Sequence, residues 1–262
     1  MNDAQARTMR HGERPLIFAL DYPGYRTEAK VEDLQLDQYG LRIRNLLRHP
    51  LPRVVDGAAY VSRILAGSSA GDGPVAAVAA YCTSAPFAFE VAAVVSRSQQ
   101  RSPKIILFDA EASTPDMILE SYRAALSGIG VQSTEQELRK SVDMALLAAD
   151  PRRFVDLLIH NIEREVIAVL QADGSGEEEA TESARHMANA YADWLSHLVS
   201  SYRSSVVSSD FEVLNIISAD GPPKGFECAA GVVRDVRMTC DRARLLRSEE
   251  TRSAVLSALA VV

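Results

Sequence analysis

The sequence contains no run of about 18 consecutive apolar residues, so no membrane-spanning helix is expected. It has only three cysteines, Cys82, Cys228 and Cys240, and their spacing indicates neither a disulfide framework nor a zinc site. It has no basic excess: 28 Lys and Arg stand against 35 Asp and Glu, and a net charge of −7 argues against a nucleic-acid partner. The polar segment 1–13 lacks the apolar stretch of a signal peptide, so a cytoplasmic location is expected.

The composition of the sequence indicates a folded protein with an extensive hydrophobic core. Of the 262 residues, 47% are hydrophobic and 24% are charged, which is enough for one large α/β domain. We expect residues 1–13 to form a disordered tail. The initiating methionine and a length near 260 residues favour a free-standing protein over an excised domain.

Short apolar runs bounded by turn residues predict the strands of a sheet. Runs that are apolar throughout are typical of parallel strands buried on both faces. The residues between the second and third runs, 83–97, have helical spacing, and a strand–helix–strand order implies a parallel sheet with right-handed crossovers. The predicted strands are Pro15–Leu20, Pro74–Tyr81, Lys104–Phe108, Phe211–Ser218 and Val232–Met238.

A helical block of about ninety residues interrupts this sheet. Ser133–Glu137 offers a capping box, and Asp150 followed by Pro151 is typical of a helix start. We therefore predict an α/β core at 14–115 and 206–262, with a helical lid insertion at 116–205. Residues 27–49 carry no clear pattern.

The segment with most chemical content surrounds Cys82. It lies between a buried strand and a helix that has Pro86 in its first turn, which is where a nucleophile elbow places its reactive residue. The positions two before and two after must be small because the two backbones nearly collide there, and they are Ala80 and Ser84. The dipole of the following helix favours a thiolate at this place.

The run AYCTSAPFAFEVA resembles the elbow of thioesterases from nonribosomal peptide and polyketide assembly lines, which are α/β-hydrolases. Phe89–Ala92 is similar to the family's aromatic-Glu-x-Ala stretch, and KIILFDAEAS is similar to the strand that delivers its catalytic aspartate, here Asp109. Cys82 replaces the family's serine. The resemblance implies an acyl or peptidyl substrate presented on the phosphopantetheinyl arm of a carrier protein, with no cofactor of the chain's own and no metal.

The family's histidine is missing at its usual place after the last strand, where Arg242 stands. Arginine does not serve as a general base, but it stabilises a thiolate or binds an anion. A displaced base from the helical block, one of His160, His186 and His197, is an alternative, and Asp193 is spaced to pair with His197.

Other candidate roles follow from position. Asp220, which ends the next strand, is an alternative acid to Asp109, although Gly221 after it is typical of a turn. The oxyanion hole would use the N–H of Thr83 and a second donor at Tyr22, since Pro23 has none to give.

These features leave three hypotheses. The leading one is an enzyme that moves acyl or peptidyl groups through a Cys82 thioester in natural-product biosynthesis, by transfer or release. The second is a catalytically silent α/β-hydrolase that acts as a binding or accessory module. The third is hydrolysis by a cysteine triad that uses one of the histidines of the helical block as its base.

Overall fold

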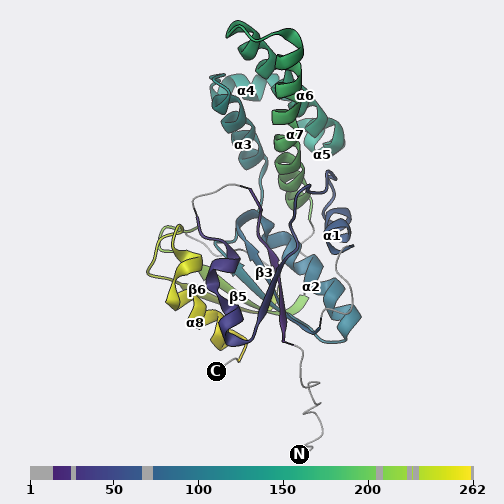
Figure 1. Ribbon diagram of the computed structural model, residues 1–262. Helices are drawn as coiled ribbons and strands as arrows, with labels where there is room; N and C mark the ends of the chain where they lie inside the picture. Colours follow the sequence, from purple (N-terminus) through teal and green to yellow (C-terminus); the bar gives the residue numbers. More distant parts are fainter. Residues whose placement is uncertain are drawn as a thin grey trace, which may run out of the picture. The chain divides into compact units, whose positions relative to one another are not determined.

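The computed structural model describes residues 14–24, 28–66, 73–204, 209–222, 226 and 230–260. The predicted tail at 1–13 lies outside these residues. Two compact units make up the chain: a sheet unit (1–48, 65–111 and 206–262) and a helical unit (49–64 and 112–205). Figure 1 shows the elements of both.

The sheet unit is built on six parallel strands in the order β2-β1-β3-β4-β5-β6. Five of them match the predicted runs, and the mostly parallel sheet of the prediction is confirmed. The strands are β1 (Leu16–Leu20), β2 (Arg42–Asn45), β3 (Val75–Tyr81), β4 (Lys104–Phe108), β5 (Ser209–Ile217) and β6 (Ala230–Arg237).

Strand β2 was not predicted, and its composition explains why. Its sequence, RIRN, alternates charged or polar residues with one isoleucine, and all four residues are at least partly exposed. It lies at one edge of the sheet, paired with β1 alone among the described strands. An edge strand of this kind has no apolar run for the sequence to reveal.

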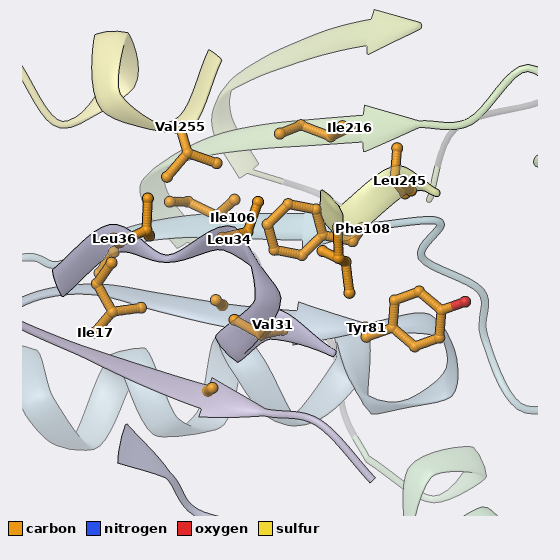
Figure 2. Packing of buried hydrophobic residues seen from close by; sticks show 14 of the residues in the cluster. Ile17, Val31, Leu34, Leu36, Tyr81, Ile106, Phe108, Ile216, Leu245 and Val255 are labelled. Atoms are coloured by element: carbon orange, nitrogen blue, oxygen red, sulfur yellow. The ribbon is translucent and has the colours of Figure 1, made fainter. Parts of the chain in front are cut away.

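Both faces of the sheet are covered. Alternate strand residues form one hydrophobic cluster with the short helices η1 (Val31–Leu34), η2 (Leu36–Tyr39) and η4 (Leu245–Arg247) and with α8 (Glu249–Ala258) (Figure 2). The intervening strand residues are also buried, and α2 (Ala85–Gln99) packs against β1, β3 and β4. Burial on two faces is why the strands read as continuous apolar runs.

The strand order reverses beside β1, which has β2 on one side and β3 on the other. In open parallel sheets, ligand sites form outside the carboxyl ends of the strands at such a reversal. The sheet therefore favours a site where β1 and β3 end; Cys82 follows β3, and Asp109 follows the adjacent strand, β4.

The helical unit has a core of its own. Its helices are α1 (Gly57–Leu65), α3 (Pro115–Gly128), α4 (Glu135–Ser141), α5 (Ala145–Ala149), α6 (Pro151–Ala172) and α7 (Glu177–Tyr202). The predicted capping box is present at Thr134 and Glu137, and the Asp150 side chain accepts a hydrogen bond from the Arg153 N–H at the start of α6. None of the described helices is long and apolar enough to cross a membrane.

Two segments differ from the predicted domains. Residues 49–64 and 112–115, predicted to lie in the α/β core, belong to the helical unit. Arg53 donates to the Asp193 carboxylate at 2.7 Å, and the Ser200 hydroxyl donates to the Val54 carbonyl at 2.7 Å. These contacts with α7 attach residues 49–64, and the chain's linear order gives no sign of them.

We predict that Ile106→Ala lowers the free energy of unfolding of the sheet unit by about 2–5 kcal/mol, because it leaves a cavity in the closed core. Ile106 is 1% exposed and lies inside the cluster of Figure 2. Urea denaturation followed by circular dichroism measures the loss. The matched control is Val232→Ala, at a 61% exposed residue of β6, for which about 0.5 kcal/mol or less is expected. Equal losses in both variants would contradict the burial argument.

Candidate active site

Cys82 sits at the apex of a sharp turn between β3 and α2. Its φ of 52° lies in the left-handed region, which is uncommon for a residue with a side chain. The short helix η3 (Cys82–Ser84) connects it to α2 without a break. Strained backbone at a strand-to-helix turn is the geometry of a nucleophile elbow, so the turn has the predicted form, and the role of Cys82 as a nucleophile stays a prediction.

Close packing around the turn explains its small residues. Ala80 and Ala85 have no exposed surface, and Ser84 is 1% exposed. Larger side chains at these positions would force the strand and the helix apart. Alanine at position 80 and serine at position 84 are small enough for this close approach.

Asp109 lies at the end of the neighbouring strand, β4, with no exposed surface and a φ of 41°. Its carboxylate accepts hydrogen bonds from the Ser218 N–H and hydroxyl, both at 2.8 Å. The alternative acid, Asp220, is exposed and accepts the Arg242 backbone N–H at 2.7 Å. Asp109 thus occupies the buried position, and Asp220 holds the backbone of the Arg242 loop.

The Arg242 guanidinium joins the thiol to the acid. Its Nη2 lies 3.2 Å from Cys82 Sγ, and its Nε lies 3.6 Å from Asp109 Oδ2. The same Nη2 donates to Glu111 Oε1 at 3.2 Å, and Nε donates to the Tyr81 hydroxyl at 3.1 Å. The guanidinium also lies over the Tyr81 ring, 5.7 Å from its centroid. Arg242 thus lies between Cys82 and Asp109, where a base would stand if these two residues were the predicted nucleophile and acid of a triad.

These surroundings keep the thiol protonated. Burial raises the pKa of Cys82, the charge of Arg242 acts in the opposite direction, and the carboxylates of Glu111 and Asp109 raise the pKa further. Burial disfavours the charge of Arg242, but its interactions with Cys82, Tyr81 and Glu111 outweigh burial and raise its pKa. The resting site is therefore a neutral thiol beside a permanent cation.

Three residues of this site did not emerge from the sequence. Tyr81 read as the end of a strand, and Glu111 is one of 35 acidic residues with no pattern to distinguish it. Gly221 read as a turn residue, but a Cβ there would overlap Asp109 Oδ1 and lie 2.9 Å from Ser218 Oγ. The glycine leaves room for the buried carboxylate.

The three histidines predicted as alternative bases lie in the helical unit. His160 and His186 are exposed. His197 is fully buried, its Nδ1 lies 3.1 Å from the Tyr60 hydroxyl, and its ring stacks on Trp194. Burial lowers the pKa of His197 to about 3, so the ring is neutral. Asp193, its proposed partner on α7, accepts hydrogen bonds from Arg53 and from the Leu51 N–H.

Thr83 and Tyr22 are the two predicted donors of an oxyanion hole. Thr83 is buried, and a hydrogen bond from its backbone N–H acts to lower the Cys82 pKa. Tyr22 is half-buried and packs over Gly24. The roles of both in an oxyanion hole stay predictions.

Cys240 is a free thiol packed against the core cluster, and Cys228 lies outside the described residues. Across the described ranges, no group of His, Cys, Asp and Glu side chains is arranged to hold a metal ion.

Comparisons with known proteins connect this chain to others through its fold. No family model and no curated protein matches the sequence. Among solved structures, a four-domain nonribosomal peptide synthetase bound to AMP and glycine matches with a TM-score of 0.50 and 12% identity. The match covers 94% of this chain but only 19% of the synthetase, so the chain spans a small part of that protein.

Two thioesterase structures match over more than nine tenths of their length. The RedJ thioesterase from the prodiginine biosynthetic pathway in Streptomyces coelicolor has 13% identity and a TM-score of 0.47, with 96% of this chain and 91% of that one covered. The NocB thioesterase domain, solved as a covalent complex with a fluorophosphonate nocardicin G analogue, has 14% identity and a TM-score of 0.44, with 94% of each chain covered. At an identity this low, the match with a TM-score of 0.50 shows a likeness of fold alone, that of the mostly parallel α/β sheet described above.

We predict that Gly221→Ala lowers the free energy of unfolding by about 1–3 kcal/mol, because the new methyl group overlaps the Asp109 carboxylate. Thermal or urea unfolding measures the change. Gly128→Ala is the control: its Cβ would meet the nearest atom, Tyr191 Oη, at 3.6 Å, an ordinary contact at a helix end. Retention of full stability by Gly221→Ala would show that Asp109 is not held as described.

Proposed function

We propose that this chain, with the fold of the thioesterase α/β-hydrolases, transfers acyl groups between thiols through a thioester on Cys82. The observation that carries the proposal is the contact between Arg242 Nη2 and Cys82 Sγ at 3.2 Å. It places a permanent hydrogen-bond donor where a serine or cysteine hydrolase has a proton acceptor.

The chemistry that this arrangement supports is thioester exchange. Cys82 loses its proton to solvent, and Arg242 stabilises the minor population of thiolate. The thiolate attacks the carbonyl carbon of an incoming thioester, a new C–S bond forms to Cys82, and the original C–S bond breaks. The departing thiol leaves as a thiolate and needs no proton from an acid. The reverse sequence, with a second thiol, discharges the acyl group.

Hydrolysis needs a group that Arg242 does not provide. Water must lose a proton as it attacks the acyl-enzyme, and a positioned base contributes about 10²–10⁴-fold to such a step. A thiol acceptor is partly ionised near neutral pH and attacks without that help. The site therefore favours a long-lived Cys82 thioester that a thiol discharges.

The structural neighbours suggest the kind of substrate. They include a nonribosomal peptide synthetase and two thioesterases, one of them from the prodiginine biosynthetic pathway. We accordingly propose a pantetheine-linked acyl or peptidyl group on a carrier protein as the substrate, with the carrier as partner.

A second candidate is a binding module without catalysis. It is favoured by the raised pKa of Cys82, because a thiol that stays protonated is a poor nucleophile. The two candidates differ in whether Cys82 ever carries an acyl group, which mass measurement decides.

We predict that incubation with a panel of acyl- and aminoacyl-pantetheine thioesters adds one acyl mass to the intact protein. Cys82→Ala removes the adduct because it removes the nucleophile. Cys240→Ala, at the other described free thiol, retains it. Added pantetheine discharges the adduct faster than buffer alone. An adduct that persists in Cys82→Ala, or none in the native chain, would reject the transfer mechanism and leave carrier binding as the function to test.

We also predict that Arg242→His increases the rate at which water discharges the Cys82 adduct, by about tenfold or more. The imidazole would replace the cation between Cys82 and Asp109 with a proton acceptor. Loss of the adduct with time, followed by mass spectrometry, gives the rate. Arg247→His is the control, since Arg247 pairs with Asp33 outside the site. If Arg242→His discharges no faster than the native chain, the missing base does not limit hydrolysis.

A further inference from the structure

Glu111 contacts the same guanidinium nitrogen as the thiol. Arg242 Nη2 lies 3.2 Å from Glu111 Oε1 and 3.2 Å from Cys82 Sγ. Glu111 is tied to the elbow through its backbone, since its N–H donates to the Cys82 carbonyl at 3.3 Å. The carboxylate is thus held beside the nucleophile by two contacts within the sheet unit.

We propose that Glu111 holds Cys82 in its neutral form by taking up the positive charge of Arg242, and so sets the pH at which the thiol ionises. The inference goes beyond acyl transfer, because it concerns the proton of Cys82 whatever reaction follows. Glu111 acts through Arg242 and is therefore a positioning residue.

The charges around the thiol support this role. One cation, Arg242, interacts with three carboxylates: Asp109, at the end of β4, Glu111, just after it, and the exposed Asp220, which accepts the Arg242 backbone N–H. Tyr81, from β3, adds an uncharged hydroxyl that accepts from Nε. A Cys82 thiolate would add a further negative charge to a cluster whose cation is already balanced, and like charges within a few ångströms disfavour ionisation.

Of the carboxylates of Asp109 and Glu111, that of Glu111 is the more exposed, and it shares a guanidinium nitrogen with Cys82. Asp109 is fully buried, is fixed by Ser218 and approaches the guanidinium from Nε. The Glu111 side chain is 27% exposed and shares Nη2 with the sulfur. Consistent with this geometry, Glu111 is the carboxylate with the larger effect in raising the Cys82 pKa. A protonated resting thiol also resists oxidation and alkylation, which require the thiolate.

The test is the ionisation midpoint of Cys82 in Glu111→Gln. The amide keeps the shape of the side chain and removes its charge, so the midpoint is expected to fall by about 0.5–1 pH unit. At a pH below both midpoints, this gives about three- to tenfold more thiolate. The midpoint is read from the pH dependence of iodoacetamide alkylation at the Cys82 peptide, which separates it from the other cysteines. No acyl substrate enters this measurement, so its outcome is independent of the proposed transfer reaction.

Glu212→Gln is the matched control. Glu212 pairs with Lys104 at 2.9 Å, near the start of β4 and β5 and thus at the other end of the strands from Cys82. Its substitution is expected to leave the midpoint unchanged. If Glu111→Gln does not fold, as judged by circular dichroism, Glu111→Ala serves for the same measurement. A midpoint that stays the same or rises when Glu111 is neutralised overturns the proposal.

A double-variant cycle tests whether Glu111 acts through the guanidinium. The midpoint shift caused by Glu111→Gln is compared in the native chain and in an Arg242→Gln background. If Glu111 takes up the charge of Arg242, the shift is larger when Arg242 is present. Equal shifts would mean that Glu111 acts only by its own charge on Cys82, and the proposed role through Arg242 would fail.

Discussion

The guanidinium of Arg242 is the group on which the arrangement of the site depends. Its N–H groups face partners from two segments of the sheet unit: Tyr81 and Cys82 at the turn after β3, and Asp109 and Glu111 after β4. Arg242 itself lies in a third segment, the loop that follows β6. Arginine suits this position because its planar fork presents several donors in fixed directions and does not lose its charge. Histidine has two ring nitrogens and a proton to exchange. At this one position, arginine therefore supplies a fixed positive charge, whereas histidine would supply a group that accepts and releases a proton.

The buried carboxylate of Asp109 makes the members of this cluster depend on one another. Asp109 has no exposed surface and is stabilised by Ser218 and by the cation. Removing one partner of such a buried pair leaves an uncompensated charge, which is costly, so the members of the cluster are interdependent. The space beside Gly221 belongs to the same constraint, because the carboxylate fits only against a residue without a side chain.

The sequence was informative wherever burial imposes a pattern. The central strands are buried on both faces, so they appear in the sequence as continuous apolar runs and could be predicted. The small residues around Cys82 indicated a close approach of strand and helix. Resemblance to a family located Asp109 and Arg242. Nothing in the sequence pointed to Glu111 or Tyr81, because their roles arise from the loop after β6 folding back over the ends of β3 and β4, and such long-range proximity leaves no local periodicity. Strand β2 and the attachment of residues 49–64 to α7 were missed for related reasons: an edge strand is polar, and contacts such as Arg53 with Asp193 join segments about 140 residues apart.

The left-handed backbone of Cys82 has a consequence for the stability of the chain. A φ of 52° is strained for cysteine and relaxed for glycine, by about 1 kcal/mol or more. Glycine at position 82 would relieve this strain, but it would remove the sulfur and its contact with Arg242. The stability of Cys82→Gly relative to the native chain therefore measures how far folding and reactivity oppose each other at this one residue.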